Sequence, residues 1–214
     1  MIKINTKNFR LPNIILNHVK ANLKSYIIAL LMFITGIFLG VLFLNNTKDE
    51  QKNEAMAYIN NYINQAKENK NINTSESLKN SIRENIILGV SLWLAGTTLI
   101  GIPIVFGIIL FRGFCLGYTI SVCTYTMGVG KGLAFVMISL LLQNILLIPA
   151  ILALGVSGIK LYKSVMKDKR KENLKVEILR HTVFSCIMLG VLIASAVVKI
   201  NVSGGMLENL IKYF

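Results

Sequence analysis

The side chains that could do chemistry in this chain are few, and they form no recognisable catalytic or metal site. Cys115, Cys123 and Cys186 lie inside apolar runs without CxxC spacing, so they predict neither a disulfide framework nor a metal site. We interpret them as small apolar packing residues. His18 and His181 flank apolar runs and have no carboxylate or cysteine at ligand spacing, so both are expected to be solvated.

Sequence motifs of enzymes are also missing. The chain contains no Walker motif, no HExxH, no GxSxG and no paired catalytic carboxylates. The prediction is therefore that the protein is not an enzyme and has no catalytic, cofactor-binding or metal-binding residues.

The polar pair Gln143 and Asn144 interrupts the centre of an apolar run, 133–154. Amides in an apolar environment are costly unless they are hydrogen-bonded. Pro149 follows within the same run and would free a backbone carbonyl one turn earlier. Two interpretations stay open for the pair. We favour polar contacts between helices, and the alternative is a partner-binding or substrate-path role.

Glycines spaced four residues apart occur twice in apolar runs, as Gly36 with Gly40 and as Gly113 with Gly117. Such pairs allow two helix backbones to approach closely. They are candidates for helix packing within the chain or for docking of a subunit or partner. Arg112 directly precedes the second pair and is predicted to be an interfacial anchor at a tight cytoplasmic turn.

These residues stand in a chain with the composition of a membrane protein. Hydrophobic residues make up 54% of the chain and charged residues 15%, whereas soluble domains carry about 25% charged residues. Residues 25–44 include no charged side chain, and a helix of about twenty residues rises ~30 Å, the thickness of a hydrocarbon core. The net charge of +13 is concentrated at the ends of apolar runs, so we assign it to the membrane surface and expect no nucleic acid partner.

Five apolar segments predict an all-α fold, a polytopic bundle of five transmembrane helices within a membrane domain at 25–201. The turn between the second and third spans is placed at Arg112–Gly113, because a charge at mid-span costs roughly 2.5–3.5 kcal/mol. The alternative turn is at Gly101–Pro103, where a glycine precedes a proline. The predicted spans are approximately 25–44, 86–111, 113–130, 133–154 and 180–200.

The segments between the spans differ in charge, which predicts the orientation of the chain. A tail at 1–24, a loop at 160–180 and Arg112 together hold 14 basic residues on one side, against nine on the other. The positive-inside rule then places the N-terminus in the cytoplasm and the C-terminus outside. Segment 45–85 is predicted to form a small outer helical cap that includes an amphipathic helix, and 202–214 a short outer tail.

The combined pattern resembles the stage II sporulation protein M family, membrane proteins with five spans from spore-forming bacteria. The resemblance extends over roughly residues 14 to 200. The motifs that carry it are GIFLG at 36–40, LIGIPI at 99–104, RGFCLGYT at 112–119 and LQNILLIP at 142–149.

This resemblance implies a non-enzymatic scaffold in the cell membrane, at the septal and engulfing membranes of the mother cell. It would anchor two peptidoglycan hydrolases, sporulation proteins D and P, for septal thinning and engulfment of the forespore. The expected partners are therefore the lipid bilayer and these hydrolases, with a homo-oligomer left open. The alternative function is a transporter or permease component, because bundles with mid-span amides and kinked helices can line a path.

Overall fold

The structure is a computed structural model that describes residues 19–67, 74–98, 101–167 and 174–211. All regular secondary structure in these ranges is helical, which confirms the predicted all-α class. The helices are α2 (Leu23–Asn46), α3 (Asp49–Lys67), α4 (Thr74–Thr97), α5 (Gly101–Met127), α6 (Val129–Lys167) and α7 (Leu174–Ile211).

Several of these helices have the length and composition of membrane spans. Four candidate spans are found among the described residues: α2, α5, Gln143–Met166 of α6 and Leu174–Ile200 of α7. The protein is therefore a multi-pass membrane protein. Helix α4 is not in this group, because its first half is charged and only its second half is apolar. The predicted count of five spans depends on α4.

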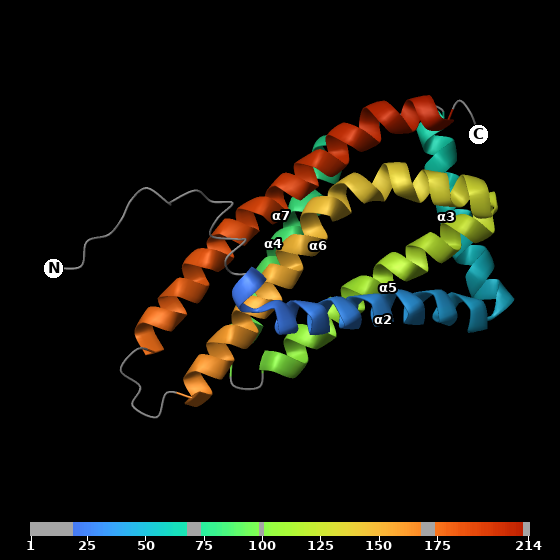
Figure 1. Ribbon diagram of the computed structural model, residues 1–214. Coiled ribbons are helices and arrows are strands. Elements are labelled where there is room, and N and C mark those ends of the chain that lie inside the picture. The colour runs from blue at the N-terminus through green and yellow to red at the C-terminus, as the bar shows by residue number, and fades with distance from the viewer. Residues whose placement is uncertain (1–18, 68–73, 99–100, 168–173, 212–214) are drawn as a thin grey trace.

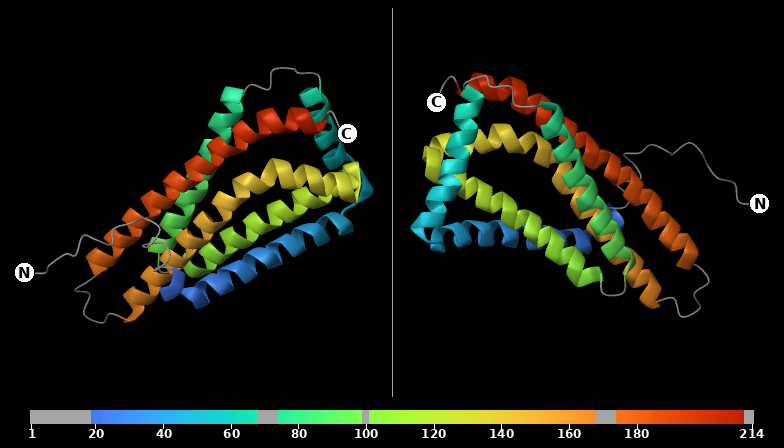
Figure 2. Two further views of the ribbon diagram at one scale, coloured as in Figure 1. Left: turned by 45° about the horizontal axis from the view of Figure 1, so that its top comes forward. Right: turned by 180° about the vertical axis from the view of Figure 1, so that it is seen from behind.

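Five helices run back and forth between two ends of the molecule, as Figures 1 and 2 show. The start of α2, the end of α4, the start of α5, the end of α6 and the start of α7 lie at one end. The junctions of α2 with α3 and of α5 with α6 lie at the other end, and α3 crosses it. The connections of α2, α4, α5, α6 and α7 thus alternate between the two ends.

The predicted turn at Arg112–Gly113 is wrong, and the break between the helices lies just before the alternative site, Gly101–Pro103. Helix α5 runs unbroken through Arg112, while α4 ends at Thr97. A Cβ atom at Gly101 would collide with the carbonyl oxygen of Ala95, so only glycine lets the start of α5 lie this close to the end of α4. Pro103 lies in the first turn of α5, where its missing N–H costs no helical hydrogen bond, and it does not kink a span. The predicted boundaries at 86–111 and 113–130 are corrected accordingly.

Helices α6 and α7 are longer than the predicted spans. Helix α6 has 39 residues with Pro149 inside it, and Figure 1 shows it bending between its yellow first part and its orange second part. A proline within a helix removes one hydrogen bond and bends it. Much of the predicted loop at 160–180 is helical, up to Lys167 and again from Leu174. Helix α7 continues to Ile211, so the predicted tail at 202–214 is largely helical.

The main hydrophobic core lies among α2, α4, α5, α6 and α7. Its fully buried side chains include Leu92, Ile109, Leu147, Leu154 and Leu192. This core holds together the helices that surround the candidate site.

Helix α3 supplies a second, smaller core at the other end of the molecule. Ile63 is buried there with Cys123 of α5 and with Phe135 and Val136 of α6, and Ile59 packs against them. The amphipathic helix predicted within segment 45–85 is therefore present. One face of it is docked onto the bundle, as expected for a helix with an apolar stripe.

Candidate functional site

Charged and amide side chains from four helices meet in a cavity of about 170 Å³, here called the polar pocket. Its polar lining consists chiefly of Glu84 of α4, Arg112 of α5, Gln143 and Asn144 of α6 and Lys199 of α7. The pocket thus combines two cations, one carboxylate and two amides. The structure brings Gln143 and Asn144 together with Arg112, which the sequence had assigned to a turn.

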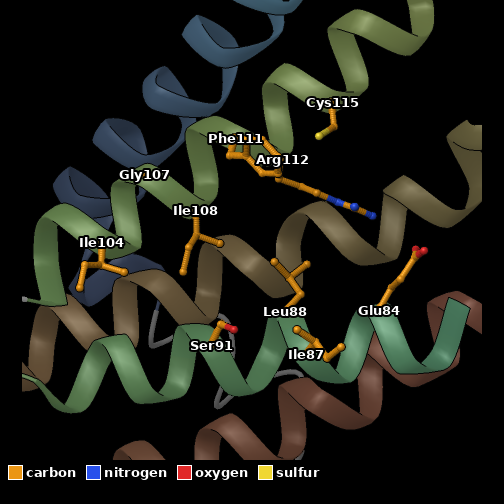
Figure 3. Close-up of a pocket in the computed structure, with 10 residues that line it drawn as sticks. All are labelled: Glu84, Ile87, Leu88, Ser91, Ile104, Gly107, Ile108, Phe111, Arg112 and Cys115. Carbon is orange, nitrogen blue, oxygen red and sulfur yellow. The ribbon is translucent and has the colours of Figure 1, made fainter. Parts of the chain in front are cut away.

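An apolar groove of about 600 Å³ between α4 and α5 shares Glu84, Arg112 and Cys115 with the polar pocket. In Figure 3 the side chains of Arg112 and Glu84 point toward one another at one end of this groove. The other lining residues are mainly apolar, and they are Ile87, Leu88, Ser91, Ile104, Gly107, Ile108 and Phe111.

Helical spacing explains why these side chains share a cavity. Residues three or four apart lie on one face of a helix, and α5 presents Ile108, Arg112, Cys115 and Thr119 in that spacing. Glu84 stands at the polar end of the corresponding face of α4. The antiparallel packing of α4 and α5 then places the charged ends of both faces together.

Asn85 fixes the rotation of α4 and thereby the direction of its neighbour Glu84. Its side chain is 1% exposed, and its Nδ2 donates to the carbonyl of Leu192 at 2.8 Å and to Oγ of Ser195 at 3.1 Å. The Ser195 hydroxyl itself donates to the Leu192 carbonyl at 2.7 Å. Successive helix residues differ by roughly 100° in direction. With Asn85 held against α7, Glu84 is directed toward the polar pocket.

The two glycine pairs meet in a single contact between α2 and α5. A Cβ atom at any of the four positions would collide with a backbone carbonyl oxygen of the other helix. Gly36 faces Leu110, Gly40 faces Phe114, Gly113 faces Phe33 and Gly117 faces Ile37. The glycines therefore pack the chain against itself, and these faces are not free for a partner.

His181 is buried, so the prediction that it is solvated is wrong. Its ring is 3% exposed, and its Nδ1 lies 2.9 Å from Oγ of Ser157. A Cβ atom at Gly96 would approach His181 Nε2 to 2.8 Å and Gly158 Cα to 2.8 Å, so two glycines make room for the ring. His181 and Ser157 line neither the polar pocket nor the apolar groove. We interpret this pair as a packing contact among α4, α6 and α7. His18 lies outside the described residues.

The cysteines differ in their surroundings. Cys123 is buried in the core beneath α3, consistent with a packing role, whereas Cys115 lines the polar pocket and Cys186 is exposed. No group of three or more His, Cys, Asp or Glu residues suited to a metal ion occurs among the described residues.

Sequence reasoning missed Glu84 and Lys199 as site residues. Both had been counted as outer surface charges, because each stands where an apolar run begins or ends. The sequence held only an indirect signal for these two residues. Arg112 and the amides Gln143 and Asn144 lie within apolar segments, where polar groups are retained with partners.

Comparison with known families gives one match. A family model described as stage II sporulation protein M matches residues 29–203. The matched range includes both glycine pairs and all five polar residues of the polar pocket. No curated protein and no solved structure matches the chain.

Proposed function

The chain belongs to the stage II sporulation protein M family, and from this premise we propose that it is a non-enzymatic membrane scaffold for wall hydrolases. The family match over residues 29–203 is the observation that carries the proposal. It makes the protein a membrane protein of a sporulation family. The partners we propose are sporulation proteins D and P, held at the septal and engulfing membranes during engulfment.

We further propose that α4 crosses the membrane as a fifth span, with the N-terminus in the cytoplasm. The polar pocket supports this, because Glu84 at the start of the apolar half of α4 is placed among Arg112, Lys199 and two amides. An ionisable group in a membrane is retained when it pairs with others inside the bundle. In this orientation α3 lies on the outer side, next to the wall.

Helix α3 is the proposed docking platform for the hydrolases. It is held to α5 by Ile63, and the corner before it is locked by Tyr125, whose hydroxyl donates to Asn45 Oδ1 at 3.0 Å. Lys52 donates to the carbonyl of Asn45 at 3.1 Å. On the opposite face of α3, Tyr58 is 74% exposed. A rigid helix that presents an exposed aromatic side chain is a suitable anchor for a partner.

Affinity isolation of the tagged protein from sporulating cells tests the proposal. Wild type should recover sporulation proteins D and P. A Glu54→Ala, Tyr58→Ala double variant, changed only on the exposed face of α3, should lose most of this recovery at equal protein abundance. Tyr162→Ala, near the opposite end of the molecule, is the matched control and should recover both hydrolases. If wild type recovers neither hydrolase, the scaffold proposal is wrong.

A permease component is the second candidate, and the charges of the polar pocket are the observation that favours it. Arg112, Lys199 and Glu84 give the interior of the bundle a polarity that an amide pair alone would not provide. The same isolation separates the two functions. A permease component would be recovered with an ATPase subunit in place of wall hydrolases.

A further inference from the structure

We propose that the polar pocket and the apolar groove together bind one anionic phospholipid. Its phosphate lies in the pocket beside Arg112 and Lys199, and one acyl chain lies in the groove between α4 and α5. This binding site is independent of the scaffold function, so either proposal can fail without the other.

The charges of the pocket match such a headgroup. Arg112 and Lys199 exceed the single carboxylate of Glu84 by one positive charge. The guanidinium of arginine presents a planar set of donors that fits phosphate oxygens. Glu84 would repel phosphate but accept hydrogen bonds from hydroxyl groups. The complementary ligand is therefore a phosphodiester headgroup that also carries hydroxyls, as phosphatidylglycerol does.

The position of the pocket along the helices also fits a headgroup. Glu84 stands where the apolar half of α4 begins, and Lys199 directly follows the apolar run of α7 that ends at Val198. Both therefore mark the level at which the hydrocarbon region ends, where lipid phosphates lie. The groove extends from that level toward the opposite end of the bundle, which is the direction of a lipid tail.

The length and the mainly apolar lining of the groove suit part of an acyl chain. Its walls run from Glu84 to Ser91 on α4 and from Cys115 to Ile104 on α5, a length of roughly 10–16 Å by helix rise.

The groove opens toward the bilayer. Ile87, Ile104 and Phe111 line it and are 55%, 48% and 64% exposed. At Gly107, within the lining, an added Cβ atom would meet no atom within 4 Å. A lipid can therefore enter from the side, and a larger side chain at position 107 would occupy the space of the acyl chain.

Native mass spectrometry of the full-length protein in detergent tests the proposal, with dioleoyl phosphatidylglycerol as the probe. Wild type should bind one phosphatidylglycerol per chain, and at least about fivefold more tightly than dioleoyl phosphatidylcholine, whose headgroup is neutral overall. Inorganic phosphate at the same concentration should not compete. Equal affinity for the two lipids, or competition by free phosphate, would overturn the proposal.

Two sets of variants separate the headgroup from the tail. Gly107→Leu should abolish the one-to-one complex. Gly190→Leu is the matched control and should bind the lipid as wild type does. Position 190 is equally open but lies on α7, outside the groove. Arg112→Gln should weaken binding about fivefold and remove the preference over phosphatidylcholine. If Arg112→Gln does not fold, the comparison of Gly107→Leu with Gly190→Leu still tests the proposal. Equal binding by Gly107→Leu and Gly190→Leu would show that the lipid sits elsewhere.

Discussion

At the scale of single residues, the contact between α2 and α5 depends on four glycines that leave no room for a Cβ atom. We predict that Gly117→Ala lowers stability by about 1–3 kcal/mol, because the new methyl group must push α2 away from α5. The matched change Gly190→Ala adds the same methyl group where no atom lies within 4 Å. Thermal unfolding in detergent measures both, and the midpoint should fall by several degrees only for Gly117→Ala. Identical midpoints would contradict the close backbone contact.

Residues of the polar pocket were only partly predictable. Arg112, Gln143 and Asn144 interrupt apolar runs and are visible in the sequence as unusual. Glu84 and Lys199 stand at the ends of such runs, where charged residues ordinarily face water. Whether they line the pocket depends on the axial positions of α4 and α7 relative to α5 and α6. The local sequence does not determine these positions.

At the scale of elements, the misplaced turn has a clear physical cause. The cost of a charge at mid-span was applied to Arg112 as if its helix stood alone in lipid. In the structure Arg112 faces the polar pocket, so α5 carries it without a turn. The glycine and proline at 101 and 103 were the correct local signals. The charge of Arg112 is tolerated because polar side chains from other helices line the same pocket.

Helix α3 gives a prediction about how an outer element is held. Ile63 is its buried contact with the bundle, and Ile63→Asp would place a carboxylate in an apolar core, which is strongly unfavourable. We expect α3 to undock while the spans remain inserted, so trypsin added to right-side-out vesicles should cleave α3 at least several times faster. Asn60→Asp introduces the same charge on an exposed position of α3 and should leave the cleavage rate unchanged. Equal rates in both variants would mean that α3 does not depend on this contact.

At the scale of the whole molecule, helical class, membrane location and family were predictable, because hydropathy and motifs are local properties of sequence. The course of the long helices was less predictable. Helix α6 is bent and continues to Lys167, well beyond the segment 133–154 predicted from composition alone. The first half of α4 is charged and largely exposed, so hydropathy does not identify this helix as a span, although Asn85 holds it against α7.

Whether α4 crosses the membrane decides the topology of the whole chain. Two single-cysteine variants test this crossing. In a background with Cys115, Cys123 and Cys186 replaced by alanine, cysteine is introduced at Asn60 on α3 or at Thr97, both of which are exposed. If the N-terminus is cytoplasmic and α4 crosses the membrane, a membrane-impermeant maleimide should label the Asn60→Cys variant in intact cells. It should label Thr97→Cys only after the cells are opened, because α4 carries that end to the cytoplasm.

The other outcomes of this labelling are equally informative. Labelling of both positions from outside would mean that α4 stays on the outer side, leaving four spans and a cytoplasmic C-terminus. The opposite pattern, with only Thr97→Cys reached in intact cells, would reverse the orientation and remove α3 from the side of the wall. We expect five crossings, because Glu84 lines the polar pocket beside Arg112 and Lys199 and so does not face lipid alone.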